Sequence, residues 1–385
     1  MKTCVALRLF LLLLLAESVA TERRLIHIQA LWRHGDRTPI ATYPTDPHQQ
    51  DAWPVPWGEL TTKGMWQQYK QGRKIKEEYI DAVKLLNSNY SLHEIHVRSS
   101  DTTRSLLSAY SNMAGFYSDS KGTHPDEAQW PAAWTPIPVH SVKKENDHLI
   151  YAFPDCPRLK ELQRKQREHK GYIDFISVNK DFFAMIQQKA QLNVTNFSQA
   201  YIFANTLTIE KLYNYTIPEW VTDDIYDKAM QIAKESFDFM FGGAGFGKEE
   251  ELELARLTGG VMISEIIDNI QNTINGKSKY RYHAYSGHDT TLAAFLRTLG
   301  AKEAIFGNGM AEYAATFIVE LWELSGESYA IRLRYSANAE APFETVTHEI
   351  VGCPASEFCP LETFIENRQK YVVKDILEKC AAKES

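Results

Sequence analysis

The sequence has no long apolar run beyond its first 20 positions, and its charge is not predominantly positive. With 42 Lys and Arg against 49 Asp and Glu, the net charge of -7 offers no basic face for nucleic acid. There is also no internal repeat and no low-complexity segment. A chain of 385 residues, 44% of them hydrophobic, buries a large core, as one domain with an insertion or as two domains.

Cysteine is scarce, with five residues in the whole chain. Cys4 lies in the N-terminal segment, and the four that remain allow three disulfide pairings. The short spacing of Cys353 and Cys359 favours a bond between them, which leaves Cys156 to join Cys380 across a long loop. Metal binding by these four cysteines is the weaker alternative. Disulfides are stable in oxidising compartments, which indicates the secretory pathway.

The N-terminal segment has the features of a secretory signal peptide. Lys2 and Arg8 accompany the apolar run Leu9–Leu15, and small residues precede the end of the segment at Ala20. We therefore expect residues 1–20 to be removed. The run is too short to span a bilayer, which disfavours the alternative of a retained membrane anchor. The mature chain is expected to be secreted or lysosomal, and four N-glycosylation sequons agree with that compartment: Asn89, Asn193, Asn196 and Asn214.

Three segments share one design, in which a strand-like apolar run ends in polar or cationic residues and leads to a helical pattern. The runs and the residues that follow them are 25–32 with Arg33 and His34, 95–97 with Arg98, and 280–286 with His288 and Asp289. Ligands bind beyond the carboxyl ends of the strands in open parallel sheets, so these residues are expected to converge. We predict an α/β fold with a mainly parallel central sheet flanked by helices.

The middle of the chain differs from its two ends. Residues 156–277 have helical spacing and few strand candidates, whereas 315–324 and 328–336 form a hairpin pattern. We predict an α/β catalytic domain made of residues 21–155 and 278–385, with 156–277 inserted as a smaller, mainly helical cap. The loop 41–59 is too rich in proline for a helix or a central strand, and it either lines the substrate mouth or only packs.

The sequence motifs that contain candidate catalytic residues lie at the ends of the three runs. A bare Arg-His-Gly is a weak signal, but "RHGDRTP" at residues 33–39 is a seven-residue word. It resembles the signature of the histidine acid phosphatases, a branch of the phosphoglycerate-mutase-like superfamily. "VRSSDTTRSLL" at 97–107 and "YSGHDTTLAAFL" at 285–296 resemble two further segments of that family in the same order. The resemblance is greatest to the secreted, lysosomal and prostatic type.

The resemblance implies a role for each matching residue. It places the nucleophile at His34 and the proton donor at Asp289. It places the phosphate-binding groups at Arg33, Arg37, Arg98 and His288. It also implies a homodimer, a phosphomonoester substrate that is a small molecule or a phosphoprotein, and no cofactor or metal ion.

The residue types fit phosphate chemistry independently of the resemblance. A phosphate monoester carries up to two negative charges, and the planar guanidinium of arginine suits phosphate oxygens. Neighbouring cations also lower the pKa of His34, so that its imidazole keeps a free lone pair in acid. Attack by His34 on phosphorus gives a phosphohistidine, and Asp289 protonates the departing alcohol. Because an aspartate is mostly ionised at pH 7, an acid optimum is expected.

Other functions are weighed against this hypothesis. A phosphatase of the same fold specialised for inositol phosphates remains an alternative, as does a catalytically silent phosphate-binding protein. A mutase of the same superfamily is disfavoured by the secretory signal and by the His288-Asp289 pair. A zinc hydrolase is weaker still, because the histidines lack the spacing of zinc ligands.

Overall fold

The computed structural model describes residues 23–132, 134–193, 197–307, 309–325 and 328–381. The predicted signal peptide and the sequon at Asn196 lie outside the described residues. The other three sequon asparagines, Asn89, Asn193 and Asn214, are exposed, as glycan acceptors must be. Among the described helices, none is both long and apolar enough to cross a membrane.

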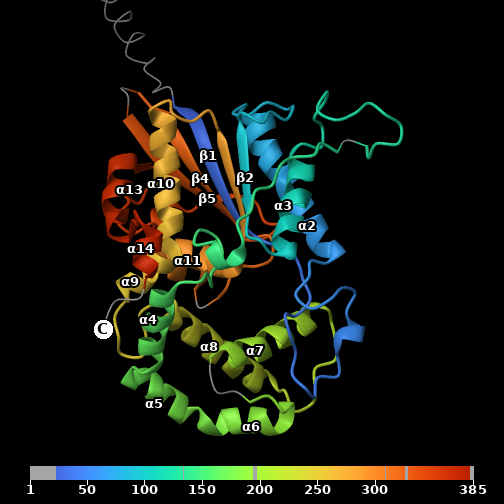
Figure 1. The fold of residues 1–385 in the computed structure, drawn as a ribbon, viewed down its shortest axis with the longest axis vertical. Coiled ribbons are helices and arrows are strands. Elements are labelled where there is room, and N and C mark those ends of the chain that lie inside the picture. Colours follow the sequence, from blue (N-terminus) through green and yellow to red (C-terminus); the bar gives the residue numbers. More distant parts are fainter. Residues whose placement is uncertain (1–22, 133, 194–196, 308, 326–327, 382–385) are drawn as a thin grey trace, which may run out of the picture.

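A central sheet runs through the upper part of the molecule (Figure 1). Its strands are β1 (Arg24–Arg33), β2 (Ile95–Ser99), β3 (Tyr282–Gly287), β4 (Thr316–Leu324), β5 (Ser328–Ser336), β6 (Glu344–Thr345) and β7 (Cys359–Pro360). The order is β2-β3-β1-β4-β5-β6, and β7 also pairs with β5. β3 pairs parallel with both β2 and β1, and all the other described strand pairs are antiparallel.

The α/β architecture is confirmed, but the sheet is mixed rather than mainly parallel. The predicted hairpin, β4 and β5, pairs from Leu324 with Ser328 onward. It joins the sheet with β4 antiparallel to β1, so one half of the sheet is antiparallel. The run of buried residues in β1 explains why this strand lies in the centre, with neighbours on both edges.

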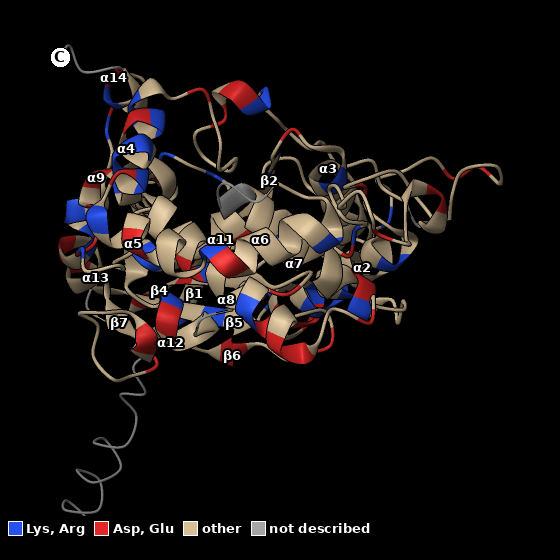
Figure 2. Cartoon of the chain, turned by 90° about the horizontal axis from the view of Figure 1, so that it is seen from below, with Lys and Arg blue, Asp and Glu red and all other residues tan. Residues whose placement is uncertain are grey.

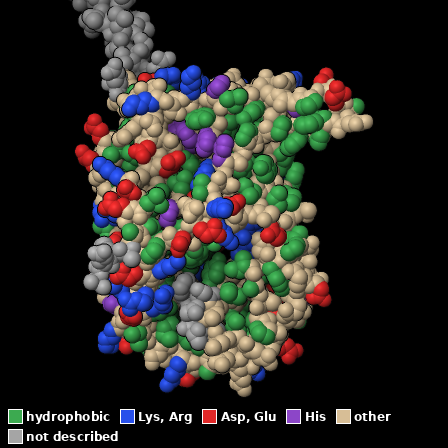
Figure 3. All heavy atoms as spheres, viewed as in Figure 1, with side chains coloured by type: hydrophobic (Ala, Val, Ile, Leu, Met, Phe, Trp, Pro, Cys, Tyr) green, Lys and Arg blue, Asp and Glu red, His purple; other side chains and the backbone are tan. Residues whose placement is uncertain are grey.

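Helices cover both faces of the sheet. On one face, α2 (Thr62–Lys76) and α3 (Thr103–Phe116) share a core with Trp32. On the other, α10 (Val261–Ile274), α11 (Asp289–Leu299) and α13 (Leu361–Arg368) share a core with Leu31. Trp32 and Leu31 are adjacent in β1 and point to opposite faces, as the period of two in a strand requires. Histidine side chains gather on the surface in one view of the molecule (Figure 3). At the amino-terminal ends of β2 and β3, His96 is in ring contact with the exposed His140 and with the buried His283.

The lower part of the molecule is helical (Figure 1). It contains α4 (Pro157–Arg167), α5 (Lys170–Val178), α6 (Lys180–Ala190), α7 (Phe197–Leu212) and α8 (Asp223–Met240). Acidic and basic residues are interspersed along these helices in the view from below (Figure 2). The described residues also form three shorter α-helices, α9 (Leu252–Ala255), α12 (Lys302–Phe306) and α14 (Ile376–Cys380). Although α10 falls within 156–277, it packs on the sheet; the division of the chain into a catalytic domain and a cap stays a prediction.

Both predicted disulfides are present. Cys353 is bonded to Cys359 in β7, and Cys156, just before α4, is bonded to Cys380 in α14. The second bond closes a sequence separation of 224 residues and ties the start of the helical region to the end of the chain.

Candidate active site

The tips of β1 and β3 lie side by side at the lower edge of the sheet. The backbone N–H of His34 donates to the carbonyl of Gly287, with a nitrogen to oxygen distance of 3.0 Å. The centroids of the His34 and His288 rings are 5.6 Å apart. Because β1 and β3 are parallel, their carboxyl ends bring two segments about 250 residues apart in sequence into one site.

Gly35 allows the loop after His34 to approach α2 closely. A Cβ atom at Gly35 would lie 2.2 Å from the carbonyl oxygen of Gly64, a distance that no side chain tolerates. The N–H of Gly35 donates to Ser108 Oγ in α3 at 3.1 Å. The glycine after the histidine is therefore required by packing, and it fixes the start of the loop between two helices.

The hydrogen bond of His34 determines which of its ring nitrogens is free. Nδ1 lies 2.8 Å from the carbonyl oxygen of Gly35. A carbonyl only accepts, so Nδ1 carries the proton and Nε2 keeps its lone pair. The side chain is 2% exposed. Burial, followed by the charges of Arg104 and Arg33, holds the pKa of His34 well below its ordinary value, so the ring is neutral in acid.

Arg33 and Arg37 are both buried next to His34. Arg33 forms an ion pair with Asp289 at 3.1 Å and stacks on the Tyr313 ring, 4.2 Å from its centroid. Arg37 donates to the carbonyl of Thr38 at 2.9 Å. The Nε atoms of both arginines are buried and have no hydrogen-bond partner among the described residues. Buried guanidinium donors without acceptors indicate a site for an anion.

Arg98 is not brought to this site, which corrects its assignment from the sequence. Its guanidinium donates to Asp147 at 2.9 Å, and the Asp147 side chain is fully buried. The same Asp147 oxygen accepts from the N–H groups of Leu149 and Ile150. Arg98 is therefore held in a structural ion pair, and it is absent from the main charges acting on His34.

Arg104 takes the place that sequence reasoning gave to Arg98. It lies in the first turn of α3, and its charge acts on both His34 and His288. Its guanidinium forms no ion pair or hydrogen bond with the part of the chain that the structure describes, and its Nε is buried. Burial and Arg37 lower the pKa of Arg104 to about 10. The motif "VRSSDTTRSLL" contains both arginines. The start of α3 at Thr103 distinguishes them, because Arg104 lies in the first turn of the helix whereas Arg98 lies in the strand before it.

Replacing Arg104 with alanine is expected to lower kcat/KM by about 10²-fold, because one fixed donor for the phosphate oxygens is lost. The melting temperature should hold or rise, since a partly buried cation whose Nε has no partner among the described residues is removed. Steady-state kinetics and thermal unfolding of the purified variant measure both quantities.

The matched control is Arg98→Ala, which should show the opposite pattern. It leaves the Asp147 carboxylate buried without its partner and should cost about 3 kcal/mol of stability, with kcat/KM of the folded enzyme nearly unchanged. A large loss of kcat/KM in Arg98→Ala, together with normal turnover in Arg104→Ala, would restore the original assignment.

His288 and Asp289 lie where β3 ends and α11 begins. The His288 side chain accepts from the N–H of Thr291, and its Nε2 lies 3.0 Å from Ser100 Oγ. Burial and Arg104 lower the pKa of His288 to about 3, so it is a neutral donor. Burial, the largest single effect, raises the pKa of Asp289, but the charges of Arg33 and Arg37 with the hydrogen bond from the Thr290 N–H together outweigh it, and the pKa lies below its ordinary value. Asp289 paired with Arg33 is therefore a carboxylate.

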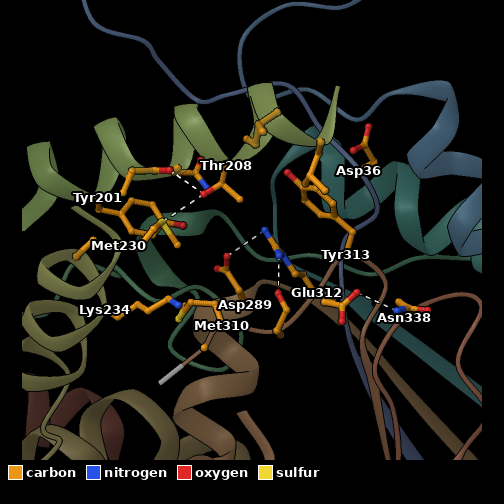
Figure 4. A pocket seen from close by; sticks show the side chains of 18 of the residues that line it. Asp36, Tyr201, Thr208, Met230, Lys234, Asp289, Met310, Glu312, Tyr313 and Asn338 are labelled. Atoms are coloured by element: carbon orange, nitrogen blue, oxygen red, sulfur yellow. Dashed lines mark hydrogen bonds and ion pairs between the residues drawn. The ribbon is translucent and has the colours of Figure 1, made fainter. Parts of the chain in front are cut away.

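A cavity of about 610 Å³ opens from Arg33 and Asp289 toward the helical region. Asp289 lies at its sheet end, and α7 and α8 form the opposite wall (Figure 4). Much of that wall is apolar: Ala204, Ile209, Leu212, Met230, Ala233 and Phe237. The charged side chains Lys63, Lys234 and Glu312 lie around it. The cavity can hold an organic group bonded to a phosphate at the sheet edge.

No group of three or more His, Cys, Asp or Glu side chains among the described residues is arranged to hold a metal ion. The charge for binding an anion at this site comes from the arginines.

Comparison with known proteins agrees with the geometry. A family model described as the histidine phosphatase superfamily (branch 2) matches residues 24–336. Lysosomal acid phosphatase of Xenopus laevis is 32% identical over 375 residues, which cover 97% of this chain and 82% of that protein. Prostatic acid phosphatase of Bos taurus is 32% identical over 394 residues, covering 99% of this chain and 95% of that protein.

Solved structures show the same fold at lower identity. The apo form of Hafnia alvei phytase superimposes with a TM-score of 0.65 at 16% identity, covering 94% of this chain and 98% of that chain. The family model covers most of the chain, and the curated relatives extend over nearly all of it. The chain thus belongs to branch 2 of the histidine phosphatase superfamily, and it is an acid phosphatase.

Proposed function

We propose that the protein hydrolyses phosphate monoesters through a phosphohistidine formed on His34 Nε2. The observation that carries this proposal is a neutral imidazole with a free Nε2 in the middle of buried arginines. The arginines Arg33, Arg37 and Arg104 bind the phosphate oxygens, and the Nε2–H of His288, which lies against Ser100 Oγ, turns to donate to the bound phosphate instead. Attack by Nε2 forms the nitrogen–phosphorus bond as the ester oxygen leaves with its electron pair. Water then attacks the phosphohistidine, releases inorganic phosphate and restores His34.

Asp289 supplies the proton for the leaving oxygen. Its carboxylate is paired with Arg33, so the proton arrives together with the substrate. A bound phosphate takes up the charge of Arg33 and adds negative charge beside Asp289, and both effects raise the pKa of that carboxyl. Binding a phosphate dianion together with one proton is favoured in acid. The acid preference follows from this coupling, and an acidic lumen of the secretory pathway suits it.

The test of this function is release of inorganic phosphate from a panel of monoesters between about pH 4 and pH 8. We expect hydrolysis with an optimum in acid, undiminished by a chelator, because the arginines supply the charge that stabilises the transferring group. Vanadate and tartrate, as anions for the same site, should inhibit. Inositol phosphates in the panel test the specialised alternative. Binding of phosphate without turnover of any ester would instead support a silent phosphate-binding protein, and activity that needs an added divalent metal would rule out the metal-free mechanism.

A further inference from the structure

The loop that follows the active-site histidine is held on α7 by a row of side chains. Four side chains of α7 and of the turn after it face this loop: Asn205 toward Arg37, Thr206 toward Ala41, Glu210 toward Asp46, and Tyr213 toward Asp36. Asn205 Oδ1 accepts from Arg37 Nη2 at 3.2 Å, and Thr206 Oγ1 donates to the carbonyl of Ala41 at 2.8 Å. The position of Arg37 therefore depends on how this loop docks on α7.

The contact between Glu210 and Asp46 differs from the others, because it joins two carboxyl groups. Glu210 is 0% exposed and Asp46 is 4% exposed. The Asp46 oxygens already accept from the N–H of His48 at 2.7 Å and from Thr42 Oγ1. Neither oxygen of Glu210 has a hydrogen-bond donor among the described residues. Two ionised carboxylates only accept, so they cannot satisfy each other.

No cation compensates this pair in the part of the chain that the structure describes. The groups coupled to Glu210 are Asp46 and Tyr43, both from the loop. The next residue of α7, Lys211, turns away to Asp223 and to the ring of Tyr226. The helices α6 and α8 present apolar side chains to the cluster that contains Tyr43: Ile186, Ala190, Ala229 and Ala233. Burial, followed by Asp46, raises the pKa of Glu210 to about 9.

We propose that Glu210 and Asp46 share one proton, and that this carboxyl pair is an acid-dependent latch that docks the loop of Arg37 on α7. The protonated oxygen of Glu210 donates to Asp46 and supplies the donor that the pair lacks. Glu210 is then a positioning residue for the phosphate site, acting through the loop rather than on the substrate. Its effect on turnover rests on the proposed function, whereas its effect on stability does not.

The direction of the pH dependence follows from the raised pKa. The folded chain binds this proton more tightly than the unfolded chain, in which Glu210 has its ordinary pKa of 4.5. The stabilisation is therefore complete below about pH 4.5, declines as the pH rises, and is lost above about pH 9. The latch holds in an acidic lumen and weakens outside it.

The experiment compares thermal unfolding of the full chain and two variants between about pH 5 and pH 8. Glu210→Gln replaces the protonated carboxyl by a neutral group that still donates to Asp46, and Glu219→Gln makes the same charge change at an exposed site. We expect the melting temperature of Glu210→Gln, relative to that of Glu219→Gln, to rise by about 5 °C across this range. Asp46→Asn should give the same reduced pH dependence and serves if Glu210→Gln fails to fold.

Infrared spectroscopy gives a second readout that needs no activity. The carbonyl band of a protonated, buried carboxyl should be present at neutral pH in the wild type and in Glu219→Gln and absent in Glu210→Gln. Glu210→Gln should keep its activity better than Glu219→Gln as the pH approaches about 9, where the intact pair loses its proton. Absence of the band from the wild type would overturn the latch. Melting temperatures of the two variants that change with pH in the same way would also overturn it. A chelator that destabilises the wild type but not Glu210→Gln would show that a cation, rather than a proton, lies between the carboxyl groups.

Discussion

Replacing His34 with alanine is expected to lower kcat/KM by at least about 10⁴-fold, because the site offers no second nucleophile in the same position. The nearest ring is that of His288, and its Nε2 already lies against Ser100 Oγ. The fold should survive, since the backbone of His34 keeps its hydrogen bonds to Gly287 and Ala314. Phosphate release and thermal unfolding of the variant measure the two effects.

Trapping the intermediate identifies the nucleophile directly. Acid quenching of the wild type with phosphorus-labelled substrate should leave acid-labile label on the chain, as expected for a nitrogen–phosphorus bond, and His34→Ala should retain none. The matched control is His96→Ala, which removes a histidine from the far group on β2 and should keep both turnover and trapping. Label found on a serine or a cysteine, or normal trapping in His34→Ala, would refute the mechanism.

Much of the fold follows from patterns that act locally. The alternation in β1 and the turn at the end of β3 identify strands whose tips carry His34 and His288, and the hairpin pattern identifies β4 and β5. The short spacing of Cys353 and Cys359 selects one of three disulfide pairings. Sequence alone does not fix the edge on which a hairpin joins a sheet, because that depends on which strand is still unpaired. For this reason the sheet is mixed where a mainly parallel one was expected.

The composition of the site was harder to predict than its location. Arg98 and Arg104 lie in the same family-like motif, Arg98 within β2 and Arg104 in the first turn of α3. Only the ion pair with Asp147, which lies 49 residues away in sequence, shows that Arg98 is committed elsewhere. Similarly, no local pattern joins Asp46 to Glu210, since loop and helix meet only in the folded chain. Partners distant in sequence decide whether a charged side chain binds a ligand or another part of the protein.

The second large effect is expected for Asp289→Asn, and its size should depend on the leaving group. An alkoxide leaves poorly without a proton, so alkyl phosphates should be phosphorylated onto His34 about 10³-fold more slowly. A phenolate such as that of p-nitrophenyl phosphate leaves without much help, so aryl esters should slow by about 10-fold or less. Single-turnover mixing measures the step itself, whereas steady-state rates can be limited by dephosphorylation, which all substrates share.

The contrast between the two ester classes separates proton donation from positioning. Asp289 is the ion-pair partner of Arg33, so its replacement also frees that guanidinium. If the carboxyl only positions Arg33, alkyl and aryl esters meet the same altered site and slow equally. If it donates the proton, the two classes diverge, and the aryl rate loses part of its dependence on pH. Equal slowing would leave Asp289 as a partner of Arg33 alone and would require the proton to come from water or from the substrate.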